Sequence, residues 1–300
     1  MRVVHDAGGW LLAIGVAALS GCAVGPDFDR PAAPDVEGFT SSPLPGKTVS
    51  TEVAGGEAQR FVQGLVIPGQ WWTLFHSEAL NTLIEEALKN NPTLPAAEAA
   101  LLQAWENVYA EQGAFFPTAV VSYSPSRNKT ATGVVFTAAS SGPPFFTLHT
   151  AQVVVSYAPD VFGGTRREVE SLTATTEFQQ FQLEAAYLTL TSNIVASAAQ
   201  EASLRGQIAT TEEIIKIQAG SLEILRKQLE LGQVAGADMA AVEATLAQAQ
   251  ATLPPLQKQL AVQRDLLTAL IGRLPSQEPA EKFELAVLQL PQDLPDQPAI

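Results

Sequence analysis

A single proline-free run, residues 165–231, limits most strongly what this 300-residue chain can fold into. Apolar side chains recur along it every seven residues, with one slip in phase: Phe181, Leu188, Val195, Ala202, then Ile208, Ile215, Leu222 and Leu229. This period predicts one α-helix near 165–231, which at ~1.5 Å per residue would be on the order of 100 Å long. Thr165 followed by Glu168 has the form of a capping box and predicts where the helix begins.

A second long helix is predicted near 237–272, after the interruption GQVAGAD at 232–238. Its apolar residues alternate at three- and four-residue spacing: Val242, Leu246, Ala249, Leu253, Leu256, Leu260, Leu267, Leu270 and Leu274. Two successive helices with such repeats predict an antiparallel coiled-coil hairpin. We interpret Asp238 as the N-cap of the second helix, and we expect Pro254 and Pro255 to bend that helix.

Two shorter helices are predicted before this hairpin. The first follows Ser77, a suitable N-cap residue, and the second spans about 95–113. We interpret the adjacent Trp71 and Trp72 as core packing at the entry to the first helix.

Between the short and long helices the period changes to two, which predicts strands near 115–127 and 146–158. In TAVVSYS (118–124) and TAQVVVSY (150–157) one face is apolar and the other carries small polar residues, with Val120 and Val154 as exceptions. The apolar face would meet a core in a soluble sheet and lipid in a transmembrane barrel, and alternation alone does not choose between them. The connecting segment is long and rich in turn residues, as an external barrel loop would be.

The first 75 residues predict an exported, anchored chain. The apolar segment WLLAIGVAAL is too short to span a bilayer and has the size of a signal-peptide core. Leu19, Ser20, Gly21 and Cys22 resemble a bacterial lipobox, in which the cysteine is lipidated; the alternative is a secretory signal with an incidental cysteine. We therefore predict a lipoprotein signal peptide at 1–21 and, because Pro, Gly and Ser are frequent, a lipid-anchored extended tether at 22–75.

Charge and motifs argue against nucleic-acid binding and catalysis. The formal net charge of −14 repels nucleic acid and, in bulk, anionic lipid surfaces. None of the three histidines (His5, His76, His149) is near a candidate nucleophile or has metal-ligand spacing, and no phosphate-binding loop, hydrolase elbow or dinucleotide fingerprint occurs. We predict no enzymatic activity, no catalytic or metal-binding residues and no cofactor.

Five stretches carry a family resemblance: CAVGPDFDRP, WWTLFHSEALNTLIEEALKNNPTLPAA, YAPDVFGGTRREVE, LGQVAGADMAAVEATLAQAQATLPPLQKQL and LLTALIGRLP. In this order they cover residues 19 to about 275, and they resemble the N-terminal half of TolC-like outer membrane efflux channels, in their NodT-type lipoprotein branch of RND efflux systems. The resemblance implies a mainly α fold with a transmembrane β hairpin: a long coiled-coil helical hairpin plus two strands of an outer membrane β-barrel. Residues 76–275 would be a first efflux-channel repeat and 276–300 a linker toward a second.

The resemblance also implies a function and partners. It implies a homotrimer with a 12-stranded barrel in the outer membrane lipid and a tunnel extending into the periplasm. The chain would be a passive exit duct that docks on a periplasmic adaptor bound to an inner-membrane pump. The expected adaptor contact is the helical tip, at Gly232, Val234, Ala235, Gly236 and Asp238, where Gly236 and Ala237 replace the Ser or Thr usual before the Asp.

Two other classes of protein stay open, a periplasmic adaptor and a structural coiled-coil lipoprotein, although neither needs the two alternating strands. We find one strand pair, one helical hairpin and no internal repeat. Three copies would supply six strands, fewer than the ~8 of the smallest bacterial barrels. We therefore expect a truncated or partial chain that does not conduct alone.

Overall fold

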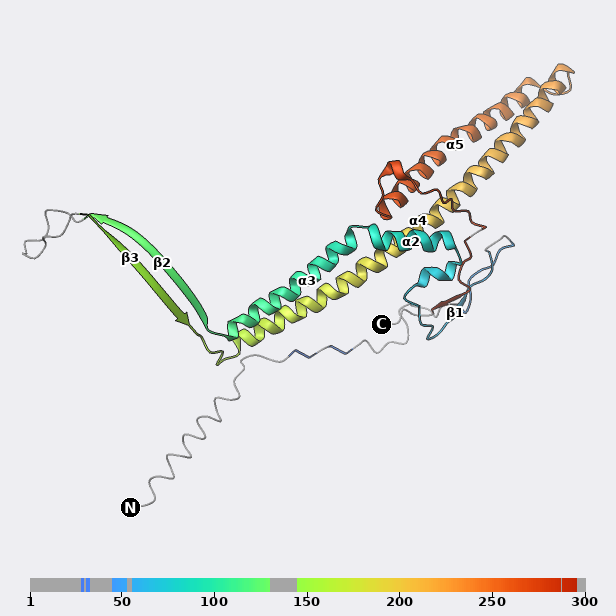
Figure 1. Ribbon diagram of the computed structural model, residues 1–300. Coiled ribbons are helices and arrows are strands. Elements are labelled where there is room, and N and C mark those ends of the chain that lie inside the picture. The colour runs from blue at the N-terminus through green and yellow to red at the C-terminus, as the bar shows by residue number, and fades with distance from the viewer. Residues whose placement is uncertain are drawn as a thin grey trace, which may run out of the picture. The chain divides into compact units, whose positions relative to one another are not determined.

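The computed structural model is mainly helical, with two long helices and one long strand hairpin (Figure 1). It divides into two compact units, one of Met1–Arg30 and Ala99–Gln180, the other of Pro31–Glu98 and Phe181–Ile300. Cys22 and the predicted signal peptide lie outside the residues that the structure describes, which are 28–29, 31–32, 45–52, 56–129, 145–286 and 288–295.

The helical hairpin consists of α4 (Gly164–Glu230) and α5 (Gly236–Leu270). Arg226 of α4 forms a salt bridge with Glu243 of α5 at 3.4 Å, and Glu201 of α4 pairs with Arg264 of α5 at 2.7 Å. A residue late in α4 thus pairs with one early in α5, and a residue earlier in α4 pairs with one late in α5. The two helices therefore run antiparallel. The predicted fold class, a long antiparallel helical hairpin plus two strands, is confirmed.

The heptad positions explain how these two helices pair. From Ile208 to Leu229 and from Val242 to Leu260 the predicted positions are half-buried or buried, while the residues between them are mostly exposed. Phe181 and Leu188, the first two members of the series, are exposed. Their exposure has a simple cause: Arg264, the partner of Glu201, already lies close to the end of α5, so α5 does not reach these earlier positions of α4.

A compact core lies where α2 (Glu78–Asn90) meets α4 and α5. The buried apolar residues of α2 are Leu80, Leu83, Ile84 and Ala87. They cluster with Trp72, with Ile194, Ala198 and Leu267 of the long helices, and with Ile271 directly after α5. The predicted N-cap is confirmed, since the hydroxyl of Ser77 accepts the backbone N–H of Leu80 at 3.4 Å. Trp72 is buried as predicted, and Trp71 is half-buried beside it.

The start of α4 differs from the sequence prediction. The helix begins at Gly164, and the N–H groups of Thr165 and Arg166 donate to the two carboxylate oxygens of Asp160 at 3.2 and 3.1 Å. The capping box predicted for Thr165 and Glu168 is therefore wrong. A carboxylate offers two acceptors and a negative charge at the positive end of the helix dipole, so Asp160 caps better than a hydroxyl.

The strand hairpin pairs β2 (Thr118–Lys129) with β3 (Phe145–Ser156), antiparallel over twelve residues each. The register sets Thr118 opposite Ser156 and Lys129 opposite Phe145. It also sets Val120 directly opposite Val154, so the two exceptions to the polar face contact one another. All residues of the two strands are exposed except Asn128, which is half-buried.

The remaining elements, apart from the 20-residue helix α3 (Thr93–Gln112), are short. They are β1 (Arg60–Val62), the 3-10 helices η1 (Trp71–Phe75), η2 (Gly113–Phe115) and η3 (Pro275–Gln277), and β4 (Asp293–Pro295). β1 and β4 pair in parallel, so the segment after α5 returns to the residues before α2. Within the predicted tether of residues 22–75, residues 60–62 form β1 and residues 71–75 form η1, where Trp72 enters the core.

Candidate functional site

The tip of the helical hairpin closes α4 with a tight turn that requires glycine. Gly232 has φ of +70°, in the left-handed region that other residues rarely adopt. The N–H of Gln233 donates to Gln228 O at 2.8 Å, and that of Gly232 to Leu229 O at 2.9 Å. This pair of bonds is a Schellman motif, which satisfies the last carbonyls of α4 and turns the chain sharply.

Asp238 begins the return helix in a role different from the predicted one. The N-cap of α5 is Ala235, and Asp238 is the third helical residue, so the N-cap interpretation of Asp238 is wrong. Its carboxylate accepts the backbone N–H of Ala235 at 3.2 Å. This is the reach-back half of a capping box, and the charge also suits the helix N-terminus. Ala235 has no side-chain acceptor, so Asp238 alone provides the side-chain cap.

The tip therefore offers a small, exposed and rigid surface. Leu231 is 72% exposed, Val234 is half-buried, and the other residues of the turn are exposed. The five residues predicted from sequence lie together in and just after one short turn: Gly232, Val234, Ala235, Gly236 and Asp238. Small side chains on a fixed turn allow the backbone of another protein to approach closely.

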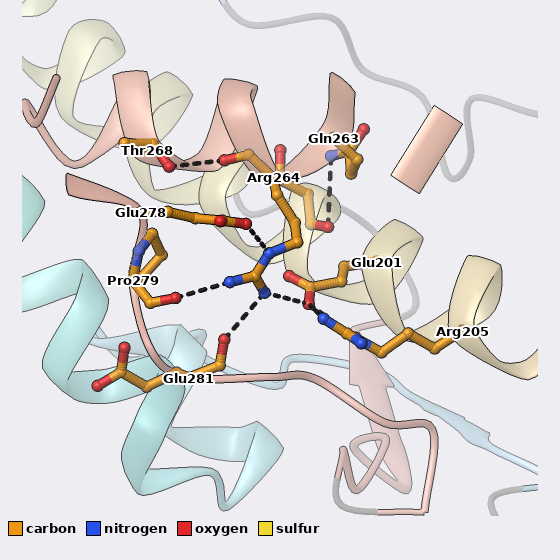
Figure 2. Close-up of polar contacts among 9 residues, drawn as sticks. Glu201, Arg205, Gln263, Arg264, Thr268, Glu278, Pro279 and Glu281 are labelled. Carbon is orange, nitrogen blue, oxygen red and sulfur yellow. Dashed lines mark hydrogen bonds and ion pairs between the residues drawn. The ribbon is translucent and has the colours of Figure 1, made fainter. Parts of the chain in front are cut away.

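A charged cluster at the base of the hairpin joins both long helices to the segment that follows α5 (Figure 2). The guanidinium of Arg264 donates to Glu201 Oε1 at 2.7 Å, to Pro279 O at 2.7 Å and to Glu281 O at 3.1 Å, and it also binds the Glu278 carboxylate. Arg205 donates twice to the same Glu201 oxygen, at 2.7 and 2.8 Å.

The centre of the cluster is buried, whereas the Glu278 side chain at its edge is 47% exposed. Glu201 is fully buried, and the side chain of Arg264 is mostly buried. Burial by itself lowers the pKa of Arg264, but hydrogen bonds and charge from Glu278 and Glu201 together raise this pKa above its usual value. Arg264 is thus a cation that stays charged while it pins residues 278–281 against the hairpin. We call Glu201, Arg264 and Glu278 the Arg264 clamp.

A second ion pair fixes the end of α5 to α2. The guanidinium of Arg273 donates to both carboxylate oxygens of Glu86, at 2.6 and 2.7 Å. The hydrogen bonds that Arg273 donates to Glu86 raise the pKa of Arg273, and burial lowers this pKa by less. Beside it, the amide of Asn91 donates to Leu270 O at 2.8 Å.

Comparison with known proteins decides the family. Residues 83–273 match the family model described as outer membrane efflux protein. The chain belongs to the outer membrane efflux protein family.

Individual relatives agree with this family. The chain is 27% identical over 284 residues to the probable efflux pump outer membrane protein TtgC of Pseudomonas putida, which covers 93% of this chain and 56% of the relative. It is 22% identical over 259 residues to nodulation protein T of Rhizobium leguminosarum bv. trifolii, covering 85% and 50%. The chain thus spans about half the length of the curated relatives it matches. The fold resembles the Campylobacter jejuni CmeC outer membrane channel, with a TM-score of 0.68 at 19% identity over 88% of this chain and 54% of that one.

The sequence predicts the turn between the two long helices but not the Arg264 clamp. The spacing of Glu201 and Arg205 predicts an ordinary helix-surface pair. One signal was present: Glu201 stands next to the heptad residue Ala202 in the apolar stretch ASAAQEASL, where a charge needs a partner. Nothing in the sequence identified that partner as Arg264.

Neither a metal centre nor a helical membrane span emerges from the described residues. Among them no group of three or more His, Cys, Asp or Glu is placed to hold a metal ion. None of the described helices combines the length and the apolar character needed to cross a membrane.

Proposed function

We propose that this chain is part of the passive exit duct of a tripartite efflux system in the bacterial outer membrane. The carrying observation is that one chain of this family joins a strand hairpin without buried residues to a very long helical hairpin. In this proposal the strands cross the outer membrane, the helices extend into the periplasm, and an inner-membrane pump supplies the energy. The chain itself catalyses no reaction and uses no cofactor.

The composition of the strand hairpin supports the membrane assignment. Twelve tilted residues per strand suffice for a bilayer, since a transmembrane strand needs about 9–11. One face carries Ala119, Val121, Val153 and Val155, and the opposite face carries Ser122, Ser124, Gln152 and Thr150. That division suits lipid on one side and a water-filled lumen on the other.

The proposed duct is an oligomer, the homotrimer that the family resemblance implies for the full-length protein. Each unpaired backbone group costs several kcal/mol in hydrocarbon, so the outer edges of β2 and β3 would pair with strands of other hairpins. The outer faces of the long helices expose apolar side chains that suit packing on neighbours, among them Ile217, Ile224, Val262 and Leu266.

The tip is the proposed contact with the periplasmic adaptor. Gly232, Val234, Ala235, Gly236 and Asp238 form a rigid turn whose shape is fixed by backbone hydrogen bonds rather than by large side chains. An adaptor that binds such a turn would contact its backbone and the negative charge of Asp238.

Cys22 is the proposed lipid anchor, after removal of a signal peptide at residues 1–21. The lipobox spacing supports this assignment. Cys22→Ser should leave a precursor of higher mass, without fatty acid, and normal processing of that variant would contradict the anchor.

Photo-crosslinking in cells tests the duct directly. A photoreactive residue at Ala235 should give an adduct with a periplasmic adaptor, whereas one at Ala219, exposed on α4 away from the turn, should not. Adducts of equal yield at both positions would argue against tip docking. The two alternatives, an adaptor and a structural lipoprotein, predict instead that the Cys22→Ser chain leaves the membrane without detergent.

A further inference from the structure

The loop end of the strand hairpin gathers positive charge on its apolar face. Arg127 lies 6.0 Å and Lys129 5.4 Å from the ring centroid of Phe145, each in a cation–π contact. The register sets Lys129 opposite Phe145, and strand alternation puts all three on the face that carries Val121 and Val153.

No acidic residue is available to neutralise these cations locally. Residues 112–159 contain no Asp or Glu, although the whole chain has 31. A net charge of −14 therefore coexists with a hairpin whose only formal charges are positive. The cations are free to attract an anion from outside the chain.

The position of the cations along the strands indicates which anion. The apolar face begins at Ala119 and Val155, continues through Tyr123 and His149, and ends at Arg127 and Lys129. At ~3.3 Å per residue and a tilt of about 40°, the cations lie roughly 20–30 Å along the membrane normal from Thr118, close to the ~25 Å height of an apolar barrel band.

Two polar side chains within that band, Tyr123 and His149, pair with each other. The hydroxyl of Tyr123 lies 2.6 Å from His149 Nδ1, and the two rings stack with centroids 5.9 Å apart. This pairing reduces the cost of placing both residues against lipid. Arg127 and Lys129 have long aliphatic stems that reach past the band while Phe145 stays at its edge.

We propose that Arg127 and Lys129, held over Phe145, bind phosphate-bearing lipid headgroups in the leaflet farther from the helices. This inference rests on the proposed function, because it requires the hairpin to cross the membrane. The planar guanidinium of Arg127 can hold two oxygens of a phosphate, and Lys129 adds a point charge beside it. Phe145 would anchor the site at the boundary between headgroups and acyl chains.

Vesicle flotation tests the proposal with the full chain. We would compare partitioning onto phosphatidylcholine vesicles and onto vesicles that also contain phosphatidylglycerol, for wild type and for Arg127→Gln with Lys129→Gln. A matched control, Arg226→Gln with Lys227→Gln, removes the same charges from α4 near the tip. At about 1 kcal/mol per basic residue, the gain from the anionic lipid should fall roughly tenfold or more in the hairpin variant. It should be unchanged in the control, and an equal gain in all three proteins would overturn the proposal.

Three further experiments separate the possible failures. Protection of the strand hairpin from proteinase K in neutral vesicles tests membrane insertion alone: protection without any anionic-lipid effect of Arg127 and Lys129 overturns the lipid site and leaves the duct intact. A hairpin digested in both vesicle types overturns both. Inorganic phosphate at constant ionic strength should not displace the protein, and displacement would identify a site for free anions instead. The charge-conserving Arg127→Lys with Lys129→Arg variant should retain most of the gain.

Discussion

The strand hairpin and the base of the helical hairpin are stabilised in opposite ways. At the base, α2, α4 and α5 bury a shared apolar core, and the Arg264 clamp ties the following segment to it. In β2 and β3 no residue is buried, although Val, Leu, Phe and Tyr are abundant there. The same residue types therefore serve an internal core in one region and an external surface in the other.

The difference shows that alternation of apolar residues does not tell what covers them. The elements that cover the base belong to the chain itself, so single substitutions there should lower its unfolding free energy with or without a membrane. The strand hairpin has no cover of its own, so substitutions in it should lower stability only in a bilayer or beside neighbouring strands.

The largest effect is expected at the Arg264 clamp. Arg264→Met keeps an apolar stem but leaves the buried Glu201 and the carbonyls of Pro279 and Glu281 without this donor. The unfolding free energy should fall by about 3–5 kcal/mol. Urea denaturation followed by circular dichroism measures this loss. A Glu-specific protease should also cut faster at Glu278 and Glu281.

Arg205 provides the matched control for this clamp. Its guanidinium donates to the same Glu201 oxygen, but within the described residues it bonds only this residue of its own helix. Arg205→Met should cost under ~1 kcal/mol and leave the protease sites protected. If both variants lose equal stability, the segment after α5 is not held by Arg264.

The next largest effect compares one apolar side chain from each region. Leu267 is fully buried in the core and Val153 is 68% exposed on β3. Leu267→Ala should cost about 2–5 kcal/mol. Val153→Ala should cost less than ~0.5 kcal/mol in detergent solution, as an exposed substitution does. A large loss for Val153→Ala under these conditions would mean that the hairpin has a covered face within the chain itself.

The sequence predicted the elements of both regions because periodicity is a local property. Heptads indicated α4 and α5, and alternation indicated β2 and β3, with the unexpected pairing of Val120 and Val154 visible only once the register was known. The contacts that position the base could not be predicted in this way. Arg264 and Glu201 are separated by 63 residues, and Arg273 and Glu86 by 187.

Helix ends were predicted less well than helix interiors. Thr165 and Asp238 have the right chemistry for an N-cap, but neither occupies that position. Asp160 caps the start of α4, and α5 has Ala235 as its N-cap with Asp238 as its third residue. A cap is chosen by backbone geometry at one residue, and a shift of two or three positions leaves the composition of the segment unchanged. Ser77 was predicted correctly because it stands alone before a clear apolar pattern.

Two glycines allow the tightness of packing at the base and at the tip to be compared. Gly272 and Gly232 both have positive φ, +78° and +70°. A Cβ on Gly272 would lie 2.7 Å from the Asn90 carbonyl oxygen, whereas one on Gly232 would meet nothing within 4 Å. Gly232→Ala should cost about 1–2 kcal/mol for backbone strain alone. Gly272→Ala should cost measurably more, and equal thermal shifts would show that α2 yields without cost at this contact.

A small effect on stability, and the most specific effect on function, is expected at Asp238. Asp238→Lys removes the acceptor for the Ala235 N–H and places a positive charge at the start of α5. Both losses occur at an exposed helix end, where such terms amount to about 0.3–1 kcal/mol each, so the unfolding transition should move little. The proposed adaptor contact should nevertheless weaken, and crosslinking from Ala235 should drop severalfold.

Asp238→Asn separates the two roles of Asp238, because the amide oxygen still accepts the Ala235 N–H while the charge is lost. If Asp238→Asn crosslinks like Asp238→Lys, the adaptor reads the charge; if it crosslinks like wild type, the adaptor reads the shape of the turn. Unchanged crosslinking in both variants, with stability lowered, would assign Asp238 to the helix cap alone and move the docking surface elsewhere.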